Sequence, residues 1–243
     1  MGQQKPIVQM QDVVKTYQQG NLQVQALRGL NLEVMPGEFT AISGPSGSGK
    51  STALNLIGAL DTATSGRVIV SGQDLSGLSR KALSELRRDH VGFVFQAYNL
   101  VPVLTAFENA EMVLALQGVP PGERRDKVMA LLAAVGLQDM ADRKPDELSG
   151  GQQQRVAIAR AIASEPAIVL ADEPTANVDS ATAENLLDLM QSLNEDRGVT
   201  FLFSTHDPRV MQRATRNVKL VDGRIAEDSA SSAASTAVAG MPA

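Results

Sequence analysis

The sequence contains no cysteine, and this absence excludes disulfide scaffolds, thiolate metal sites and thiol catalysis. Its two histidines are too few for a metal site built from imidazoles. Aromatic residues are also scarce, at 3% of the chain, with no tryptophan and only two tyrosines. We therefore expect the chemistry of this protein to depend on oxygen ligands or on phosphate groups.

Positive charge is in deficit as well. The chain has 22 lysines and arginines against 27 acidic residues, which gives a formal net charge of −5. Proteins that bind nucleic acids in general need the opposite balance, because they must neutralise phosphates. We expect no nucleic acid partner.

Long hydrophobic runs are missing too. A membrane-spanning helix needs about eighteen or more consecutive apolar residues. The most apolar stretch, residues 91–104, is interrupted by Gln96, Asn99 and Pro102. The N-terminal residues also lack the pattern of a secretory signal. We expect that the chain does not span a membrane, so that any work at a membrane needs a separate polypeptide for the span.

The periodicity of the sequence indicates an α/β fold. Of the 243 residues, 43% are hydrophobic, enough for the core of one large domain or of two small ones. Short alternating strands at residues 7–14, 22–25 and 30–34 predict a small N-terminal antiparallel sheet. From Phe39 the pattern changes to strand, glycine-rich loop and helix. Later strands, several of them apolar enough for a mostly parallel sheet, are predicted at residues 67–70, 91–95, 167–171, 200–203 and 218–221.

The middle of the chain has a helical pattern and no convincing strand. Helices are predicted at residues 106–116, 124–135 and 152–163. We interpret residues 105–164 as an α-helical subdomain, inserted into a core of about residues 6–104 and 165–226, in a single domain 1–226. A further helix is predicted at residues 179–194, and Asp222 and Gly223 predict a tight turn between the last two strands. The Ala/Ser-rich tail, residues 227–243, is predicted to be disordered.

A glycine-rich loop carries the first functional signal. The segment GPSGSGKS matches G-x-x-x-x-G-K-[ST] and lies between a predicted strand and a predicted helix, as this P-loop motif requires. Its glycines let backbone N–H groups point inward, and the helix dipole adds positive potential, so that the loop can cradle an anion. We expect Lys50 to reach the β- and γ-phosphates of a bound nucleotide, and Ser51 to coordinate Mg²⁺. An ordinary glycine-rich turn is the alternative. The candidate residues are Gly44, Pro45, Ser46, Gly47, Ser48, Gly49, Lys50, Ser51 and Thr52.

Two adjacent carboxylates end an apolar strand. The segment IVLADE places Asp172 and Glu173 at the carboxyl edge of the sheet, where the phosphates must lie. Asp172 suits the coordination shell of Mg²⁺, and Glu173 suits a general base for the attacking water. Two solvated acids in a turn before Pro174 are the alternative.

With these residues in place, the segment LSGGQQQRVAIARAI at residues 148–162 resembles the signature of ABC-type ATPases. From the residues alone, a serine and two glycines at the start of a helix form a second anion cradle or an ordinary helix cap. The resemblance implies the ABC ATPase fold and a homodimer in which the signature of one copy closes over ATP on the P-loop of a second copy. The signature residues that it implies are Ser149, Gly150, Gly151 and Gln152.

Four more positions match the family. Tyr17 resembles the aromatic residue that stacks on adenine, and Gln96 resembles the glutamine that senses Mg²⁺ and water. His206 resembles the histidine that holds the γ-phosphate and orients Glu173, and Asp179 resembles the aspartate that couples the two sites of the dimer. The alternatives are a surface tyrosine, a buried amide and a structural histidine. The segment Ala176-Asn177-Val178-Asp179 departs from the commoner Ser-Ala-Leu-Asp sequence of the family but keeps the acid.

The resemblance covers residues 6–226 and is strongest to the ATPase subunits of the macrolide-exporter and lipoprotein-releasing group. It implies an ATPase that is held at the cytoplasmic face of the inner or plasma membrane by separate integral permease subunits and drives export or extraction. A docking groove is expected to form with the helical insertion from Phe95, Tyr98, Leu100, Val101 and Val103.

The sequence also allows functions other than transport. The same ATP-driven closure serves mechanical signalling to envelope or cell-division enzymes, and the sequence does not separate that function from transport. A soluble ABC ATPase acting on DNA or the ribosome is disfavoured by the acidic balance and the lack of heptads. A P-loop kinase or GTPase is weakened by the signature and by the lack of a guanine-reading segment.

Overall fold

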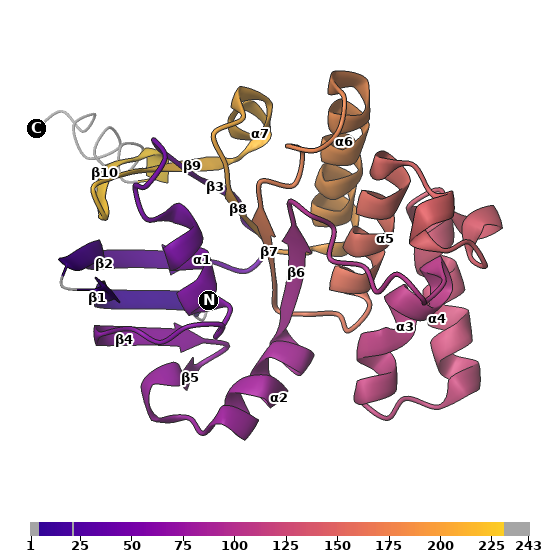
Figure 1. The fold of residues 1–243 in the computed structure, drawn as a ribbon, viewed down its shortest axis with the longest axis horizontal. Helices are drawn as coiled ribbons and strands as arrows, with labels where there is room; N and C mark the ends of the chain where they lie inside the picture. The colour runs from indigo at the N-terminus through magenta and orange to yellow at the C-terminus, as the bar shows by residue number, and fades with distance from the viewer. Residues whose placement is uncertain (1–4, 21, 231–243) are drawn as a thin grey trace, which may run out of the picture.

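Two β-sheets lie side by side in the structure, a computed structural model that describes residues 5–20 and 22–230 (Figure 1). The smaller sheet is antiparallel, in the order β2-β1-β4-β5. The larger has the order β10-β9-β3-β8-β7-β6, and all its neighbouring strands are parallel except β9 and β10. The strands are β1 (Val8–Gln19), β2 (Leu22–Val34), β3 (Phe39–Ser43), β4 (Ser65–Val70), β5 (Gln73–Asp74), β6 (Val91–Phe95), β7 (Ile168–Asp172), β8 (Phe201–Ser204), β9 (Arg216–Val221) and β10 (Arg224–Asp228).

Some of the helices pack against the sheets, and the others form an insertion at the end of the molecule that is far from the antiparallel sheet. Helices α3, α4 and the start of α5 form this insertion, on the side away from the antiparallel sheet (Figure 1). The predicted helical subdomain is thus seen between β6 and β7. The helices are α1 (Lys50–Ile57), α2 (Arg80–His90), α3 (Ala106–Leu116), α4 (Pro121–Ala134), α5 (Gly150–Ile162), α6 (Ser180–Arg197) and α7 (Pro208–Arg213).

The larger sheet separates two hydrophobic cores. Ile42, Leu170 and Leu202 point to the face that is covered by α1 and the antiparallel sheet. Their neighbours Val169 and Phe203 point to the opposite face, which is covered by the insertion and α6. Because successive side chains of a strand point to opposite faces, a sheet that is buried on both sides needs strands that are apolar throughout. This requirement explains the continuous apolar segments that mark these strands in the sequence.

The helices that border the insertion begin at well-defined caps. The Thr105 hydroxyl accepts a hydrogen bond from the Glu108 amide, and the Glu108 carboxylate accepts one from the Thr105 amide, at the start of α3. Ser149 and Gln152 form the same reciprocal pair at the start of α5. Such capping boxes satisfy amide groups that the first turn of a helix leaves free.

Several predicted strands differ from the observed ones. Residues 22–25 and 30–34 are parts of one strand, β2, because the chain continues through Gly29 at a φ of +79° with bulges in its pairing with β1. The segment at residues 67–70 does not join the mostly parallel sheet. It lies in β4, which pairs antiparallel with β1 and buries mainly one face, through Val68 and Val70.

Two helices extend the predicted set, and the last strand continues past the predicted start of the tail. Helix α2 is capped by the Ser79 hydroxyl and is mostly polar, with Leu86 as its buried residue, and α7 is a short helix that begins at Pro208. The predicted tail boundary at residue 227 is wrong for Glu227 and Asp228. Both belong to β10, where Asp228 forms an ion pair of 2.7 Å with Arg216. Residues 231–243 of the predicted disordered tail lie outside the described residues.

Within residues 5–20 and 22–230, no helix combines the length and the apolar character that crossing a membrane requires.

Candidate functional site

A pocket of about 680 Å³ lies at the carboxyl edge of β3, β7 and β8. Parallel strands end at a common edge, so the loops that follow them meet there although they are distant in the sequence. Of the predicted site residues, this pocket is lined by Tyr17, Gly44, Pro45, Ser46, Gly47, Gly49, Lys50, Ser51, Thr52, Gln96, Glu173 and His206.

The loop between β3 and α1 requires its glycines. Gly44 has a φ of +141°, and a Cβ atom there would lie 2.1 Å from the carbonyl oxygen of Leu220. At Gly49, with a φ of +103°, a Cβ atom would lie 2.6 Å from the carbonyl oxygen of Ala26. Any side chain at these positions would displace neighbouring backbone. The Lys50 ammonium donates hydrogen bonds to the carbonyls of Gly44 (2.8 Å) and Pro45 (3.0 Å), which hold it over the loop.

A hydroxyl and a carboxylate meet at the floor of this site. Ser51 Oγ, in the first turn of α1, donates a hydrogen bond of 3.1 Å to Asp172 Oδ1, at the end of β7. The two residues are 121 positions apart and are brought together by the neighbouring ends of the strands. Hydroxyl and carboxylate oxygens are the protein ligands that Mg²⁺ takes beside substrate phosphates.

Glu173 and His206 are in direct contact. His206 Nδ1 lies 2.6 Å from Glu173 Oε1, and the Thr205 hydroxyl donates a hydrogen bond of 3.1 Å to Glu173 Oε2. The Glu173 side chain is 18% exposed and the His206 side chain 76% exposed. Glu173 also has a φ of +45°, which a non-glycine residue adopts only where the surroundings impose it. The carboxylate is therefore fixed at both oxygens, with the histidine on its open side.

Gln96 follows β6 and lies on the pocket wall. Its backbone carbonyl accepts a hydrogen bond of 2.9 Å from the Asn177 side chain, and the Tyr98 hydroxyl donates to the Asn177 carbonyl at 3.0 Å. The side-chain amide of Gln96 lies 3.5 Å from the Asn177 side-chain oxygen. Asn177, which marks the departure from the commoner wording before Asp179, thus connects the segment after β7 to the segment after β6.

Tyr17 is held in place by contacts with Asp61 and Lys15. Its hydroxyl donates to Asp61 Oδ2 at 2.9 Å, and Lys15 forms an ion pair of 2.6 Å with the other oxygen of Asp61. The Lys15 ammonium also lies 4.8 Å from the centre of the Tyr17 ring, within cation–π range. Burial raises the pKa of the Tyr17 hydroxyl, and the carboxylate of Asp61 adds to the increase. The ring is fixed as a phenol beside the P-loop.

A second group of predicted residues does not line the pocket. The Ser149 hydroxyl caps α5, and Cβ atoms added at Gly150 and Gly151 would lie 2.7 Å from the Tyr98 hydroxyl and 2.4 Å from the Thr182 methyl group. Asp179 caps α6 and accepts hydrogen bonds from the Thr182 amide and hydroxyl, which lower the pKa of its carboxyl group. The signature residues Ser149, Gly150, Gly151 and Gln152 thus lie beside the start of α6, apart from the P-loop of the same chain.

The profile of the ABC transporter family matches residues 27–176, more than half of the sequence. The chain belongs to the ABC transporter family. An uncharacterized ABC transporter ATP-binding protein of Thermotoga maritima is 47% identical over 221 residues, which are 91% of this cassette and 94% of that protein. The macrolide export ATP-binding/permease protein MacB of Brucella melitensis is 46% identical over 223 residues. These residues are 92% of this cassette but 34% of MacB, so the cassette spans about a third of that relative.

Solved structures of ABC cassettes share this fold. A dimeric ATP-binding cassette, MJ0796, in a post-hydrolysis state with ADP and Pi, is 44% identical, with a TM-score of 0.84. The match covers 91% of this cassette and 97% of that chain. The predicted fold class, an ABC ATPase fold with its mostly parallel sheet, antiparallel subdomain and helical insertion, is confirmed.

The residues of the cassette fit a magnesium nucleotide. The loop around Gly44 and Gly49 approaches neighbouring backbone so closely that only glycines fit. Ser48 Oγ is buried in this loop and has no hydrogen-bond partner among the described residues, so a polar group is available for an anion. Ser51 and Asp172 supply the oxygen pair for the metal. An anion cradle beside a hydroxyl–carboxylate pair is the arrangement that binds phosphates together with Mg²⁺.

Sequence reasoning missed three residues that hold the site together. Thr205 binds Glu173, Asp61 anchors Tyr17, and Asn177 binds the Gln96 segment. Thr205 could have been suspected, because it lies directly before His206 at the end of a strand. Nothing in the sequence marks Asp61, whose partner Tyr17 lies 44 residues away.

Proposed function

We propose that this cassette is the ATP-binding and ATP-hydrolysing subunit of an ABC transport complex, which drives export or extraction through a separate transmembrane partner. The observation that carries the proposal is the convergence of the P-loop, the Ser51–Asp172 pair and the Glu173–His206 pair on one pocket. A cradle, a metal site and a base at one sheet edge are the components that phosphoryl transfer to water requires.

Binding depends on the P-loop. The inward backbone N–H groups and the start of α1 hold the phosphates, and Lys50 adds its charge at the β- and γ-phosphates. Ser51, Asp172 and Gln96 would hold Mg²⁺, which would neutralise charge on the phosphate oxygens. Tyr17 presents its ring to the adenine. The pocket has few other groups that could read the base, because Val24 and Ala26 line this part of it.

Hydrolysis depends on Glu173. Its carboxylate accepts a proton from a water molecule as the water oxygen bonds to the γ-phosphorus and the bond from that phosphorus to the bridging oxygen breaks. Thr205 and His206 fix the carboxylate, so that it needs little reorganisation in the transition state. The exposed His206 is available to hold the γ-phosphate.

A second copy of the cassette completes the site. Ser149 begins α5, a helix of 13 residues, and lies apart from the P-loop of its own chain. The free amide groups at this helix start can hold a γ-phosphate only if the phosphate is bound to another copy. The dimeric state of the similar cassette MJ0796 supports this arrangement. Asp179, beside the signature in each copy, is placed to couple the two sites.

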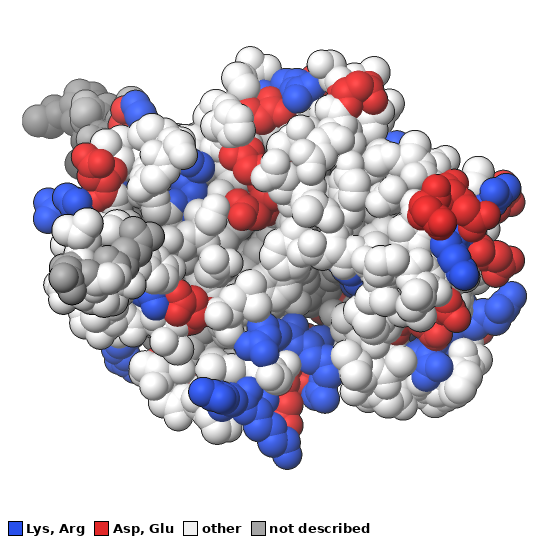
Figure 2. Space-filling view, viewed as in Figure 1, with Lys and Arg blue, Asp and Glu red and all other residues white. Residues whose placement is uncertain are grey.

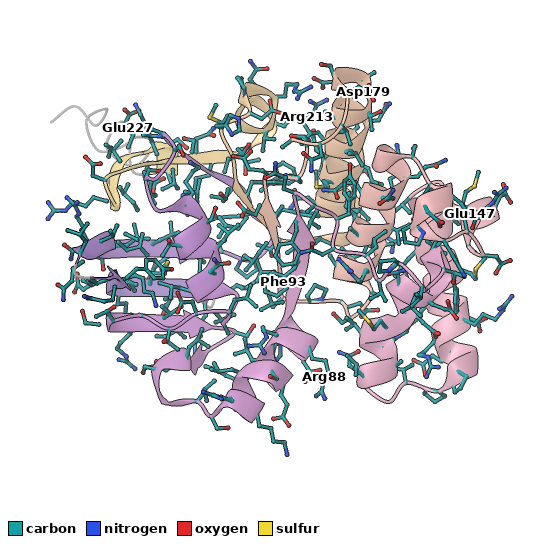
Figure 3. The ribbon with its side chains drawn as sticks, viewed as in Figure 1. Arg88, Phe93, Glu147, Asp179, Arg213 and Glu227 are labelled. Atoms are coloured by element: carbon teal, nitrogen blue, oxygen red, sulfur yellow. The ribbon has the colours of Figure 1, made fainter. Side chains whose placement is uncertain are left out.

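The membrane partner has a candidate docking groove. A cavity of about 400 Å³ lies between α2, β6 and α3, and its walls include Phe93, Phe95 and the exposed Leu116. Of the five residues predicted for this groove, only Phe95 lines it, while Leu100 packs against the core. Figure 3 shows Phe93 on β6 and Arg88 at the end of α2.

The lining of the groove is positively charged. Arg87, Arg88 and Arg160 line it, none of its described lining residues is acidic, and Lys and Arg side chains gather along this lower edge of the molecule (Figure 2). We infer that it receives an amphipathic cytoplasmic helix of the integral permease. The cassette would thereby be held as a peripheral subunit at the cytoplasmic face of the membrane.

The proposal is tested by phosphate release from ATP by the purified cassette with and without Mg²⁺. We expect magnesium-dependent hydrolysis in the parent protein and none in Lys50→Ala, which removes the charge at the phosphates but no core contact. Activity that is equal in both proteins would contradict the assignment of the site.

A further inference from the structure

The loops after β7 and β8 are joined by more than the contact between Glu173 and His206. The Thr175 hydroxyl donates a hydrogen bond of 2.9 Å to Asp207 Oδ2. The Asp207 amide donates to the Thr205 hydroxyl at 2.9 Å, and this hydroxyl donates to Glu173. A continuous chain of hydrogen bonds thus begins two residues after the proposed base and returns to the base itself.

Thr175 and Asp207 are both fixed on other sides. Thr175 is 2% exposed, so its hydroxyl depends on partners within the protein. Asp207 caps α7 by accepting a hydrogen bond of 2.9 Å from the Arg209 amide. It also forms an ion pair of 2.7 Å with the Arg209 guanidinium. A carboxylate that is held at both oxygens forms a rigid anchor, and here it anchors the residue next to His206.

The same network reaches the start of α6, where the Arg209 guanidinium donates a hydrogen bond of 3.5 Å to the Ser180 carbonyl. Arg213, on α7, forms ion pairs with Glu184 and Asp188 on α6 at 2.5 and 2.6 Å. Figure 3 shows Arg213 on the α7 side facing α6, with Asp179 near the start of that helix. Helix α7, which follows His206, is therefore fastened to the helix that follows Asp179.

We propose that Thr175 and Asp207 are positioning residues, which hold the His206 loop in register with Glu173 and connect both loops to the start of α6. The inference rests on the proposed ATPase function of the site. Without the Thr175 hydroxyl, Asp207 remains bound to Arg209 and α7 remains capped, but the loop loses the one of these ties to the segment after β7 that does not run through Glu173. A displacement of the catalytic groups by about 1 Å costs up to about 10²-fold in rate.

The test compares two substitutions of one residue. Thr175→Val removes the hydroxyl and keeps the branched shape, and Thr175→Ser keeps the hydroxyl. We expect kcat for ATP hydrolysis to fall about tenfold in Thr175→Val, with KM for ATP unchanged because the P-loop is intact, and to stay near the parent value in Thr175→Ser. A parent-like kcat in Thr175→Val, or an equal loss in both variants, would overturn the proposal.

A matched control and a second measurement separate positioning from folding. Thr200 is equally buried and accepts a hydrogen bond from the Gly37 amide at the opposite end of β8. Thr200→Val should lower Tm and leave kcat unchanged. Amide hydrogen exchange reports the loop without turnover, and residues 205–207 should exchange at least about threefold faster in Thr175→Val than in Thr175→Ser. Equal exchange would contradict the proposal even if kcat fell.

Asp207→Asn completes the argument. Asparagine still caps α7 but leaves one carbonyl oxygen in place of two carboxylate oxygens, so the bond from Thr175 is weakened. If both residues act through one bond, the double variant should lose no more activity than the worse single variant. Losses that multiply would refute the shared role. A parent protein without magnesium-dependent hydrolysis would instead refute the proposed function, and the exchange measurement would still decide the tie.

Discussion

The replacement of Glu173 by glutamine isolates proton acceptance from all other properties of the site. Glutamine has the shape of glutamate, and its amide oxygen can still accept the hydrogen bond from Thr205 Oγ1. Its amide nitrogen would take the position of Oε1, which lies 2.6 Å from His206 Nδ1, and could donate a hydrogen bond to this nitrogen of a neutral imidazole. The P-loop is untouched. Glu173→Gln should therefore fold normally and bind ATP with unchanged affinity.

The expected loss follows from the proton transfer alone. General base catalysis contributes about 10²–10⁴-fold, so kcat for ATP should fall by at least about 10²-fold, which is about 2.7 kcal/mol in the barrier. Because the γ-phosphate then persists, the dimer should accumulate with ATP. The assays are phosphate release at saturating ATP and size-exclusion chromatography with and without ATP.

A matched control keeps this test specific. Glu195, on α6, accepts a hydrogen bond of 2.8 Å from Gln191 and is exposed, far from the pocket lining. Glu195→Gln carries the same chemical change and should keep the parent kcat. The reasoning is refuted if Glu173→Gln retains more than about a tenth of the parent activity, or if it binds ATP much more weakly than the control.

Three further outcomes are expected. Gly44→Ala should destabilise the protein by about 2–3 kcal/mol and weaken ATP binding, because the new Cβ would lie 2.1 Å from the Leu220 carbonyl oxygen. An unchanged free energy of unfolding in urea and an unchanged ATP affinity in calorimetry would disprove the need for glycine. Ser149→Ala should cost about 1 kcal/mol through the lost helix cap and reduce kcat about 10²-fold, with ATP affinity of the monomer unchanged, whereas equal loss of binding would argue against a shared site. The hydrogen bonds from Arg209 lower the pKa of Asp207 to about 2, below the unfolded value, so its contribution is complete above about pH 4 and is lost as the pH falls to 2. Between these pH values the parent should lose about 2 kcal/mol more unfolding free energy than Asp207→Asn, and parallel curves from chemical unfolding would contradict this assignment.

The sequence predicts well where its pattern is strong and local. Strand β6 and helix α3 begin and end at the predicted residues, because β6 is apolar throughout and Thr105 with Glu108 marks the start of α3. Strand β4 was predicted in the wrong sheet, since a short apolar segment does not reveal which strand it pairs with. Helix α2 was not predicted, because it is short and mostly polar.

In the candidate site, too, some features could be predicted from the sequence and others could not. The P-loop motif and the strand before Asp172 predict that Ser51 and Asp172 lie near each other, because parallel strands end at one edge. The partners of Tyr17 and the bond between Thr175 and Asp207 could not be predicted. They depend on how loops of different strands lie side by side, and polar side chains in loops carry no periodic pattern.

The most direct measurement is a structure of Glu173→Gln with ATP and Mg²⁺. The account predicts a head-to-tail dimer in which Ser149 Oγ of each copy lies about 3 Å from a γ-phosphate oxygen of the ATP held by Lys50 of the other copy. A nucleotide bound to Lys50 with Ser149 of both copies more than about 6 Å from every phosphate oxygen would contradict it.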